Sequence, residues 1–75
     1  MNPVDVLSEV AGNVLDIACQ VGGEVAVDEV LMLVESMKME IPTTSPVHGI
    51  VVECLVSVGD NVGEGDVLAR VRPLA

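Results

Sequence analysis

The sequence contains no phenylalanine, tryptophan or tyrosine, and only three of its 75 residues are cationic. Lys38 is the single lysine, whereas Arg70 and Arg72 lie near the C-terminal end. Twelve carboxylates outnumber these cations and give a formal net charge of −9. Such a chain repels phosphate backbones and anionic lipid headgroups, so we expect no nucleic-acid partner and no membrane partner. The same charge argues against direct binding of nucleotides or acyl-CoA.

Long apolar runs are also missing. The longest, Val30–Val34, has five residues, whereas a membrane-spanning helix needs about 20. The N-terminus has neither a basic segment nor a long apolar segment, so we expect no signal or transit peptide. Cys19 and Cys54 are too far apart for a CxxC redox motif or a zinc site. We therefore expect a cytoplasmic protein without a metal, whose two cysteines are small buried hydrophobic residues.

Valine, by contrast, is abundant and accounts for 17 residues. Its branched side chain is stiff at χ1 and suits a pleated sheet. No stretch keeps an apolar period of 3.6 residues for two helical turns, so no helix is expected. A chain of this length has room for one modest core, with an expected free energy of unfolding of about 4–11 kcal/mol. The composition therefore predicts one all-β domain over residues 1–75.

The sequence also repeats itself at an offset of 37 residues. Residues 12–34 align with residues 49–71 at 8 identical positions out of 23. Valine content alone would raise such a match, but paired glycines argue for a true repeat because glycine marks particular backbone turns. Two equivalent β-units of about four strands each, packed face to face, predict a flattened β-barrel or sandwich with internal pseudo-two-fold symmetry and a core of about residues 4–72. We term any two residues that this offset of 37 pairs repeat mates; the identical pairs are Gly12/Gly49, Val14/Val51, Val21/Val58, Gly22/Gly59, Val25/Val62, Val30/Val67, Leu31/Leu68 and Val34/Val71.

Within each half, apolar and polar residues alternate with a period of two, as is typical of strands. Turns at residues 22–23 and 59–61 are expected to follow the first strand of each half. Further turns at 28–29 and 65–66 precede apolar runs. The residues expected to face inward are Leu15, Ile17, Cys19 and Val21 in the first half and Val52, Cys54, Val56 and Val58 in the second.

A hairpin is predicted at the junction of the halves. The apolar run 30–34 leads into Glu35-Ser36-Met37-Lys38-Met39-Glu40, and a turn-rich segment follows at 46–49. A connection between symmetric units lies on the surface, so we expect Lys38 at an exposed tip and both chain termini away from it. A two-residue turn at Met37-Lys38 favours positive φ, for which Asn-Gly is the usual pair. We therefore expect backbone strain at this turn.

These features resemble the biotinyl/lipoyl attachment domains, and specifically the compact biotin carboxyl carrier domains that lack an inserted thumb. The resemblance covers most of the chain and implies two four-stranded antiparallel sheets with a modified lysine on a hairpin tip. The Met-Lys-Met centre is similar to the biotin attachment signature. The motifs that carry the resemblance are Glu35-Ser36-Met37-Lys38-Met39-Glu40, Pro46-x-x-Gly49, Gly59-Asp60-Asn61-Val62 and Gly65-Asp66-Val67-Leu68.

The resemblance implies a covalent N6-biotinyl group on Lys38, installed by a biotin protein ligase. It also implies a swinging-arm shuttle that carries a carboxyl group from a biotin carboxylase to a carboxyltransferase. Such a domain is a non-catalytic component of a biotin-dependent acyl-CoA or keto-acid carboxylase, of which the acetyl-CoA carboxylase of fatty acid biosynthesis is one kind. The residues implied in ligase recognition at the tip are Glu35, Ser36, Met37, Met39 and Glu40.

Two alternatives remain open. Ser36 stands where biotin domains more usually have alanine, and lipoyl domains often carry serine or threonine there, so a lipoyl carrier or a dual biotin/lipoyl carrier is the second reading. The third is an acidic docking module with an unmodified Lys38. No catalytic residues are expected, and His48, in a turn without other ligands, is expected to be an exposed turn residue. Met1 favours a free subunit over the end of a larger carboxylase.

Overall fold

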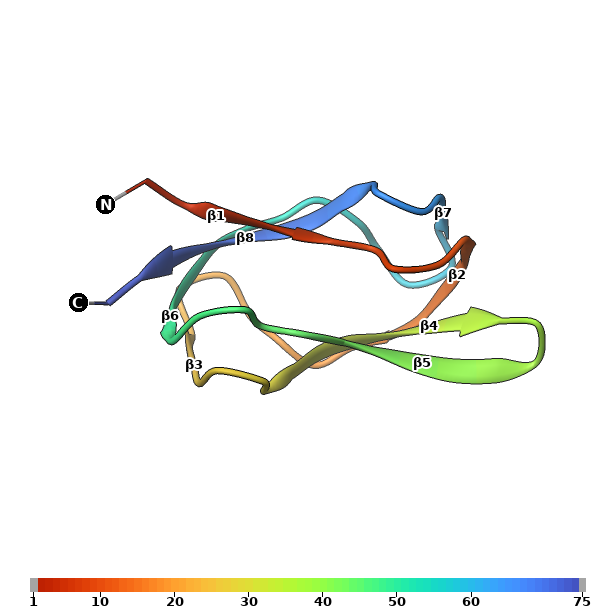
Figure 1. Ribbon diagram of the computed structural model, residues 1–75, viewed down its shortest axis with the longest axis horizontal. Helices are drawn as coiled ribbons and strands as arrows, with labels where there is room; N and C mark the ends of the chain where they lie inside the picture. Colours follow the sequence, from red (N-terminus) through yellow and green to blue (C-terminus); the bar gives the residue numbers. More distant parts are fainter. Residues whose placement is uncertain (1, 75) are drawn as a thin grey trace.

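The fold, a computed structural model that describes residues 2–74, is a sandwich of two antiparallel four-stranded sheets (Figure 1). One sheet has the strand order β1-β8-β6-β3 and the other the order β5-β4-β2-β7. This confirms the predicted fold class. None of residues 2–74 belongs to a helix that could span a membrane. The strands are β1 (Val4–Leu7), β2 (Gly12–Ile17), β3 (Glu24–Val25), β4 (Val30–Ser36), β5 (Met39–Thr44), β6 (Gly49–Cys54), β7 (Asn61–Val62) and β8 (Val67–Pro73).

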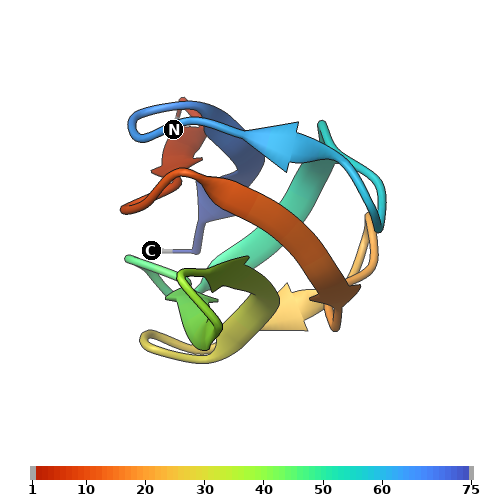
Figure 2. The same cartoon turned by 90° about the vertical axis from the view of Figure 1, so that its right-hand side faces the viewer.

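The two sheets are related by the same offset of 37 residues that the sequence shows. Strands β2, β3 and β4 become β6, β7 and β8 when 37 is added to their bounds. Each half also gives its two-residue strand to the opposite sheet, because β3 pairs with β6 and β7 pairs with β2. The halves therefore interlock, and the predicted pseudo-two-fold symmetry is confirmed (Figure 2).

The structural repeat is longer than the aligned segments, because β1 and the end of β5 are also equivalent. Ser8 and Ser45, which are 37 residues apart, are 2% and 0% exposed. The Oγ of each donates a hydrogen bond of 2.6 Å to the carbonyl oxygen two residues on, in Val10 and Val47. Identical serines and valines at the same offset were the signal in the sequence that would have shown this extension.

The core between the sheets consists of aliphatic side chains and one methionine. The inner faces of the two sheets meet in a single cluster, and the neighbouring residues 31–32 in β4 and 68–69 in β8 are all buried. Because no aromatic ring is available, many small side chains fill this space. The buried members are Val6, Val14, Val25, Leu31, Met32, Val34, Val51, Val62, Leu68, Ala69 and Val71.

Two β-bulges alter the predicted alternation. The register shifts between Val14 and Asp16 in β2 and at the equivalent place in β6. A bulge adds one residue to one strand and so changes which side chain faces inward. Val14 and its mate Val51 are therefore buried, whereas Leu15 is 38% exposed and Val52 is only half-buried. The prediction of an inward Leu15 was wrong for this reason.

Val21 and Val58 were also expected to face inward, and this was wrong. They are 62% and 61% exposed. The strands before them end at Ile17 and Cys54, and both valines lie in turns closed by backbone hydrogen bonds across residues 20–23 and 57–60. The alternation predicted from the sequence was thus extended past the ends of the strands. The remaining inward residues, Ile17, Cys19, Cys54 and Val56, pack against the core as predicted but are only partly buried.

Cys19 and Cys54 are free thiols of intermediate exposure. Burial raises the pKa of the Cys19 thiol above its ordinary value, and the neighbouring Cys54 side chain raises this pKa further. The Cys54 Sγ lies 3.4 Å from the carbonyl oxygen of Val56, to which it donates. The two thiols therefore behave as partly buried apolar groups near the core.

We expect iodoacetamide to modify Cys19 more slowly in the folded protein at pH 8 than in the same chain unfolded in guanidinium. Only the thiolate reacts, and a raised pKa lowers the thiolate fraction in the folded state. The rate in the folded protein should rise at higher pH than in the unfolded chain. Timed mass spectrometry of a Cys54→Ser variant measures this rate for Cys19 alone. Equal rates in the folded and unfolded chains would contradict the burial of this thiol.

Candidate functional site

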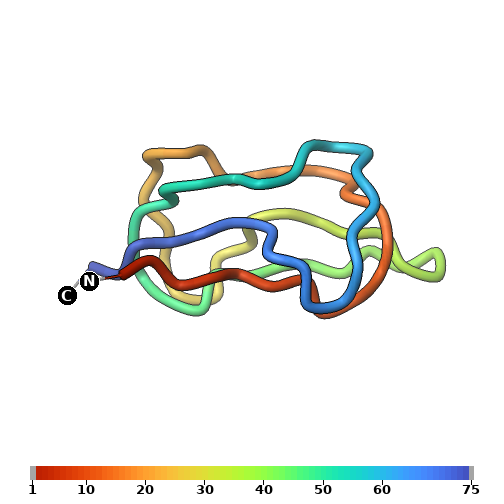
Figure 3. Tube along the Cα trace, turned by 90° about the horizontal axis from the view of Figure 1, so that it is seen from above, coloured from red at the N-terminus to blue at the C-terminus, as the bar shows by residue number. Residues whose placement is uncertain are grey.

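The β4–β5 hairpin projects beyond the rest of the sandwich and carries Lys38 at its tip (Figures 1 and 3). The two strands pair up to Ser36 and Met39, which leaves Met37 and Lys38 as a two-residue turn. The molecule is 37 Å long and 17 Å across. Strand β1 begins and strand β8 ends at the opposite end of the long axis (Figure 1). As far as residues 2–74 show, the tip is therefore unobstructed by the chain ends, as predicted.

Both residues of the turn have a left-handed backbone. The φ angles are 52° for Met37 and 65° for Lys38. Positive φ at both central residues is the pattern of a type I′ turn, which suits the twist of a two-residue hairpin. A side chain with a Cβ atom costs energy in this region, about 1–2 kcal/mol per residue. The expected strain at Met37-Lys38 is thus present, and both side chains are exposed to solvent.

We expect Met37→Asn to stabilise the protein by about 1 kcal/mol, because asparagine tolerates positive φ and Met37 is 93% exposed, so little packing is lost. For a domain of this size that gain corresponds to a rise of about 4–8 °C in melting temperature. Met39→Asn is the matched control, since Met39 is an exposed methionine without positive φ. No gain over the control in a thermal unfolding experiment would show that the turn is unstrained.

The hairpin is supported from below by strand β2. Pairing between β2 and β4 extends to Asn13 opposite Glu35, and beyond that row no other strand within residues 2–74 pairs with the hairpin. Gly12 permits this close approach, because a Cβ atom there would lie 2.0 Å from the carbonyl oxygen of Glu35. The sequence marked this glycine as repeated, but the need for close backbone contact was visible only in the structure.

Two carboxylates flank the tip on one side of the hairpin. Glu35 and Glu40 occupy directly opposite positions on β4 and β5, and both are exposed. None of the ion pairs formed among residues 2–74 involves Lys38. The primary amine is therefore presented to solvent on a strained, narrow support. An amine in this position can be acylated by an enzyme that deprotonates it.

The structure brings together the residues predicted at the tip. Met37, Met39, Glu35 and Glu40 are exposed around Lys38, and Ser36 is half-buried. The unbranched methionine side chains can adapt to different surfaces. The role of these five residues in recognition stays a prediction.

Other chemistry-bearing residues lie away from the tip. His48 is exposed, as expected, but its Nε2 lies 2.6 Å from Oε2 of Glu24, a contact that the sequence did not reveal. The pairing of β3 with β6 brings these two residues together. Asp28 has φ 69°, where its mate Gly65 has φ 87°, so an aspartate takes the left-handed position.

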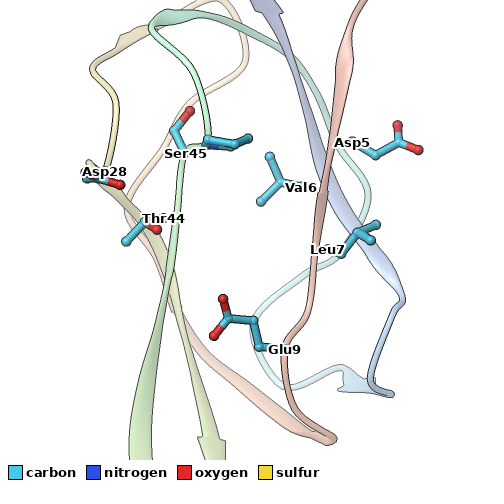
Figure 4. Close-up of a pocket in the computed structure, with 8 residues that line it drawn as sticks. Asp5, Val6, Leu7, Glu9, Asp28, Thr44 and Ser45 are labelled. Carbon is cyan, nitrogen blue, oxygen red and sulfur yellow. The ribbon is translucent and has the colours of Figure 1, made fainter.

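A pocket lies between the edge strands β1 and β5 (Figure 4). Lys38 is not among its lining residues. In Figure 4 the Glu9 side chain extends toward the gap, whereas Asp5 points away from it. Asp5 accepts a hydrogen bond from Nε of Arg70 at 2.9 Å. The pocket and the exposed lysine are therefore separate features.

Comparison with known proteins gives several matches. The biotin/lipoyl family described as "Biotin-requiring enzyme" matches residues 4–71. A biotinylated protein of Mycobacterium leprae, the TB7.3 homolog, is 45% identical over 65 residues, which are 87% of this chain and 92% of that protein. The dihydrolipoyllysine-residue acetyltransferase component of the pyruvate dehydrogenase complex of Pseudomonas aeruginosa is 32% identical over 68 residues, covering 91% of this chain and 12% of that protein.

Among solved structures, the urea carboxylase of Kluyveromyces lactis contains a similar fold. The TM-score is 0.91 at 26% sequence identity, over 96% of this chain and 6% of the carboxylase. The match thus includes nearly all of this chain and a small part of the larger enzyme. The family match extends over both repeat halves and the projecting hairpin. The chain belongs to the biotinyl/lipoyl attachment domain family, whose members carry biotin or lipoate covalently.

Proposed function

We propose that this protein is a biotin carboxyl carrier in which Lys38 bears the cofactor. The observation that carries the proposal is the position of the only lysine, exposed at a type I′ turn on a hairpin that projects from a compact sandwich. The hairpin fits a covalently held biotin, because Lys38 supplies an accessible amine. No residue in the range 2–74 forms an ion pair with this amine. Bound biotin supplies a nitrogen that can carry a carboxyl group.

The residues near the tip suit a carrier whose partner enzymes perform the chemical steps. The carrier supplies position and exposure, and partner enzymes supply the chemistry: a biotin protein ligase, a biotin carboxylase and a carboxyltransferase. A flexible arm fixed to Lys38 makes each later encounter effectively intramolecular and raises the local cofactor concentration. The fold shared with urea carboxylase supports a carboxylase context. Three further points stay predictions: an acyl-CoA or a keto acid as the acceptor substrate, the lack of nucleic-acid and membrane partners, and a cytoplasmic location.

A lipoyl carrier, or a carrier of both cofactors, is the second candidate. It is favoured by the similarity to the lipoyl-bearing acetyltransferase component and by Ser36. The Met-Lys-Met sequence and the similarity to the biotinylated Mycobacterium leprae protein favour biotin.

Parallel ligation reactions distinguish the two cofactors. Protein made without either cofactor is incubated with ATP and either biotin plus a biotin protein ligase or lipoate plus a lipoate ligase. We expect rapid biotinylation of Lys38 and little lipoylation, measured by avidin blot and by intact mass. Exclusive lipoylation would overturn the biotin assignment, and a lysine that neither ligase modifies would favour the unmodified docking module.

A further inference from the structure

The outer faces of the two sheets are equivalent in position but differ in charge. On the β1-β8-β6-β3 sheet, Arg70 stands in the middle of a row with Asp5 and Glu53 on either side. Its Nε lies 2.9 Å from Asp5 Oδ1 and its Nη1 lies 3.2 Å from Glu53 Oε1. One cation therefore offsets two carboxylates across three strands.

The equivalent row on the β5-β4-β2-β7 sheet lacks this cation. Leu33 takes the place of Arg70, between Asp16 and Pro42 in the strand register. In the next row toward the tip, Glu35 takes the place of Arg72 and lies opposite Glu40. We term the five residues of this sheet the acidic face: Asp16, Leu33, Glu35, Glu40 and Pro42. None of its three carboxylates is in an ion pair formed among residues 2–74.

This arrangement does not serve the stability of the sheet. Like charges directly opposite each other on neighbouring strands destabilise a β-sheet. The opposite sheet shows that the same fold accommodates arginines at the equivalent positions. The acidic face also has an apolar centre, Leu33 and Pro42, where its counterpart has an ion pair. Protein-binding surfaces commonly combine an apolar centre with polar residues at its edge, and here carboxylates lie beside the apolar pair.

The position of the acidic face limits which partner can cover it. Strands β4 and β5 form both the acidic face and the hairpin that holds Lys38. An enzyme that uses the cofactor at the end of a long arm can keep its active site away from these strands. An enzyme that attaches the cofactor must reach the ε-amine itself, so its surface has to lie against the strands beside the tip.

We propose that the acidic face is the docking surface for the biotin protein ligase, which would contact it with lysine and arginine side chains around an apolar spot. This inference rests on the proposed function. Charge complementarity of this kind mainly speeds association and fixes orientation, and salt weakens it. The contact surface would then extend from the tip to Asp16, beyond the residues that the sequence singled out.

A pair of repeat mates gives a matched test. Asp16 and Glu53 are both exposed, occupy equivalent places on opposite sheets and are 37 residues apart. Asp16→Lys and Glu53→Lys change the net charge equally. We expect Asp16→Lys to lower kcat/KM for biotinylation by the ligase of the source cell about tenfold at low salt, with a smaller loss at high salt. Glu53→Lys should stay within about twofold of the unchanged protein.

Thermal unfolding and size-exclusion chromatography accompany the kinetics. Asp16→Asn, a milder variant, should lower kcat/KM in the same direction and unfold at the temperature of the unchanged protein. Equal kcat/KM for the two lysine variants would overturn the docking proposal while leaving the carrier function intact. A dimer that Asp16→Lys dissociates would also overturn it, because a second copy would then occupy the face. No biotinylation of the unchanged protein would instead refute the proposed function.

Discussion

Lys38→Arg is expected to abolish covalent modification and, with it, all carboxyl transfer through this protein. The guanidinium of arginine stays protonated and cannot form the amide that holds the cofactor. The fold should survive, because Lys38 is exposed. Lysine and arginine both carry a Cβ atom, so the substitution does not change the backbone strain at φ 65°. Its side chain takes part in none of the ion pairs among residues 2–74. Avidin blotting and a bicarbonate incorporation assay measure the loss, and thermal unfolding measures the stability.

Arg70→Lys is a useful companion to this variant, because it adds a second lysine on the outer face of the opposite sheet. A ligase that selects the projecting hairpin should modify Lys38 and leave the new lysine free. Peptide mapping distinguishes the two positions. Modification of the Lys38→Arg protein at another amine would show that the tip is not the attachment site, whereas unfolding of this variant would contradict the exposed position of Lys38.

Gly49→Ala is expected to destabilise the protein by about 3 kcal/mol. A Cβ atom at this position would lie 2.2 Å from the carbonyl oxygen of Arg72 and 2.9 Å from Cγ1 of Val71. The first neighbour is backbone within strand β8, so it cannot rotate away, and the two strands must separate. In a domain of this size the loss lowers the melting temperature by about 12–24 °C. Because the whole stability is about 4–11 kcal/mol, much of it would be lost.

Gly63→Ala is the matched control for this effect. The nearest atom to a Cβ at Gly63 is Oδ2 of Asp66 at 3.6 Å, an ordinary contact, and this glycine does not have positive φ. We expect a change of less than about 1 kcal/mol in a denaturant titration. Similar losses in both variants would mean that strand β6 does not depend on the close approach to β8.

Gly12→Ala should match Gly49→Ala in stability but differ in function. The two glycines are repeat mates with the same kind of clash, against Glu35 in one case and Arg72 in the other. Only the Gly12 clash lies beneath the projecting hairpin, so only that variant should also disturb the tip.

The sequence predicted the fold well because two independent signals agreed. The valine-rich alternation indicated strands, and the 37-residue offset placed them in two equivalent units. The alternation failed at Leu15, because the bulge in β2 depends on long-range pairing with β4 and leaves no mark in a period-two pattern. It failed at Val21 because the end of a strand is set by the turn that follows.

The candidate site likewise has features that the sequence predicted and features that it did not. Its local features, the lysine tip and the strained Met37-Lys38 turn, were predictable because a two-residue hairpin constrains its own backbone. Its non-local features were not. The row formed by Asp16, Leu33 and Pro42 depends on the register of three strands, and it joins residues that are far apart in the chain.

The most direct test of the central claim is the mass of the protein isolated from its own cell, followed by mapping of the peptide that contains Lys38. Exposure of the only lysine on a projecting hairpin predicts one added biotinyl group, located on that residue and detected by avidin. An unmodified lysine, or a lipoyl group in place of biotin, would contradict the proposal that this protein is a biotin carrier.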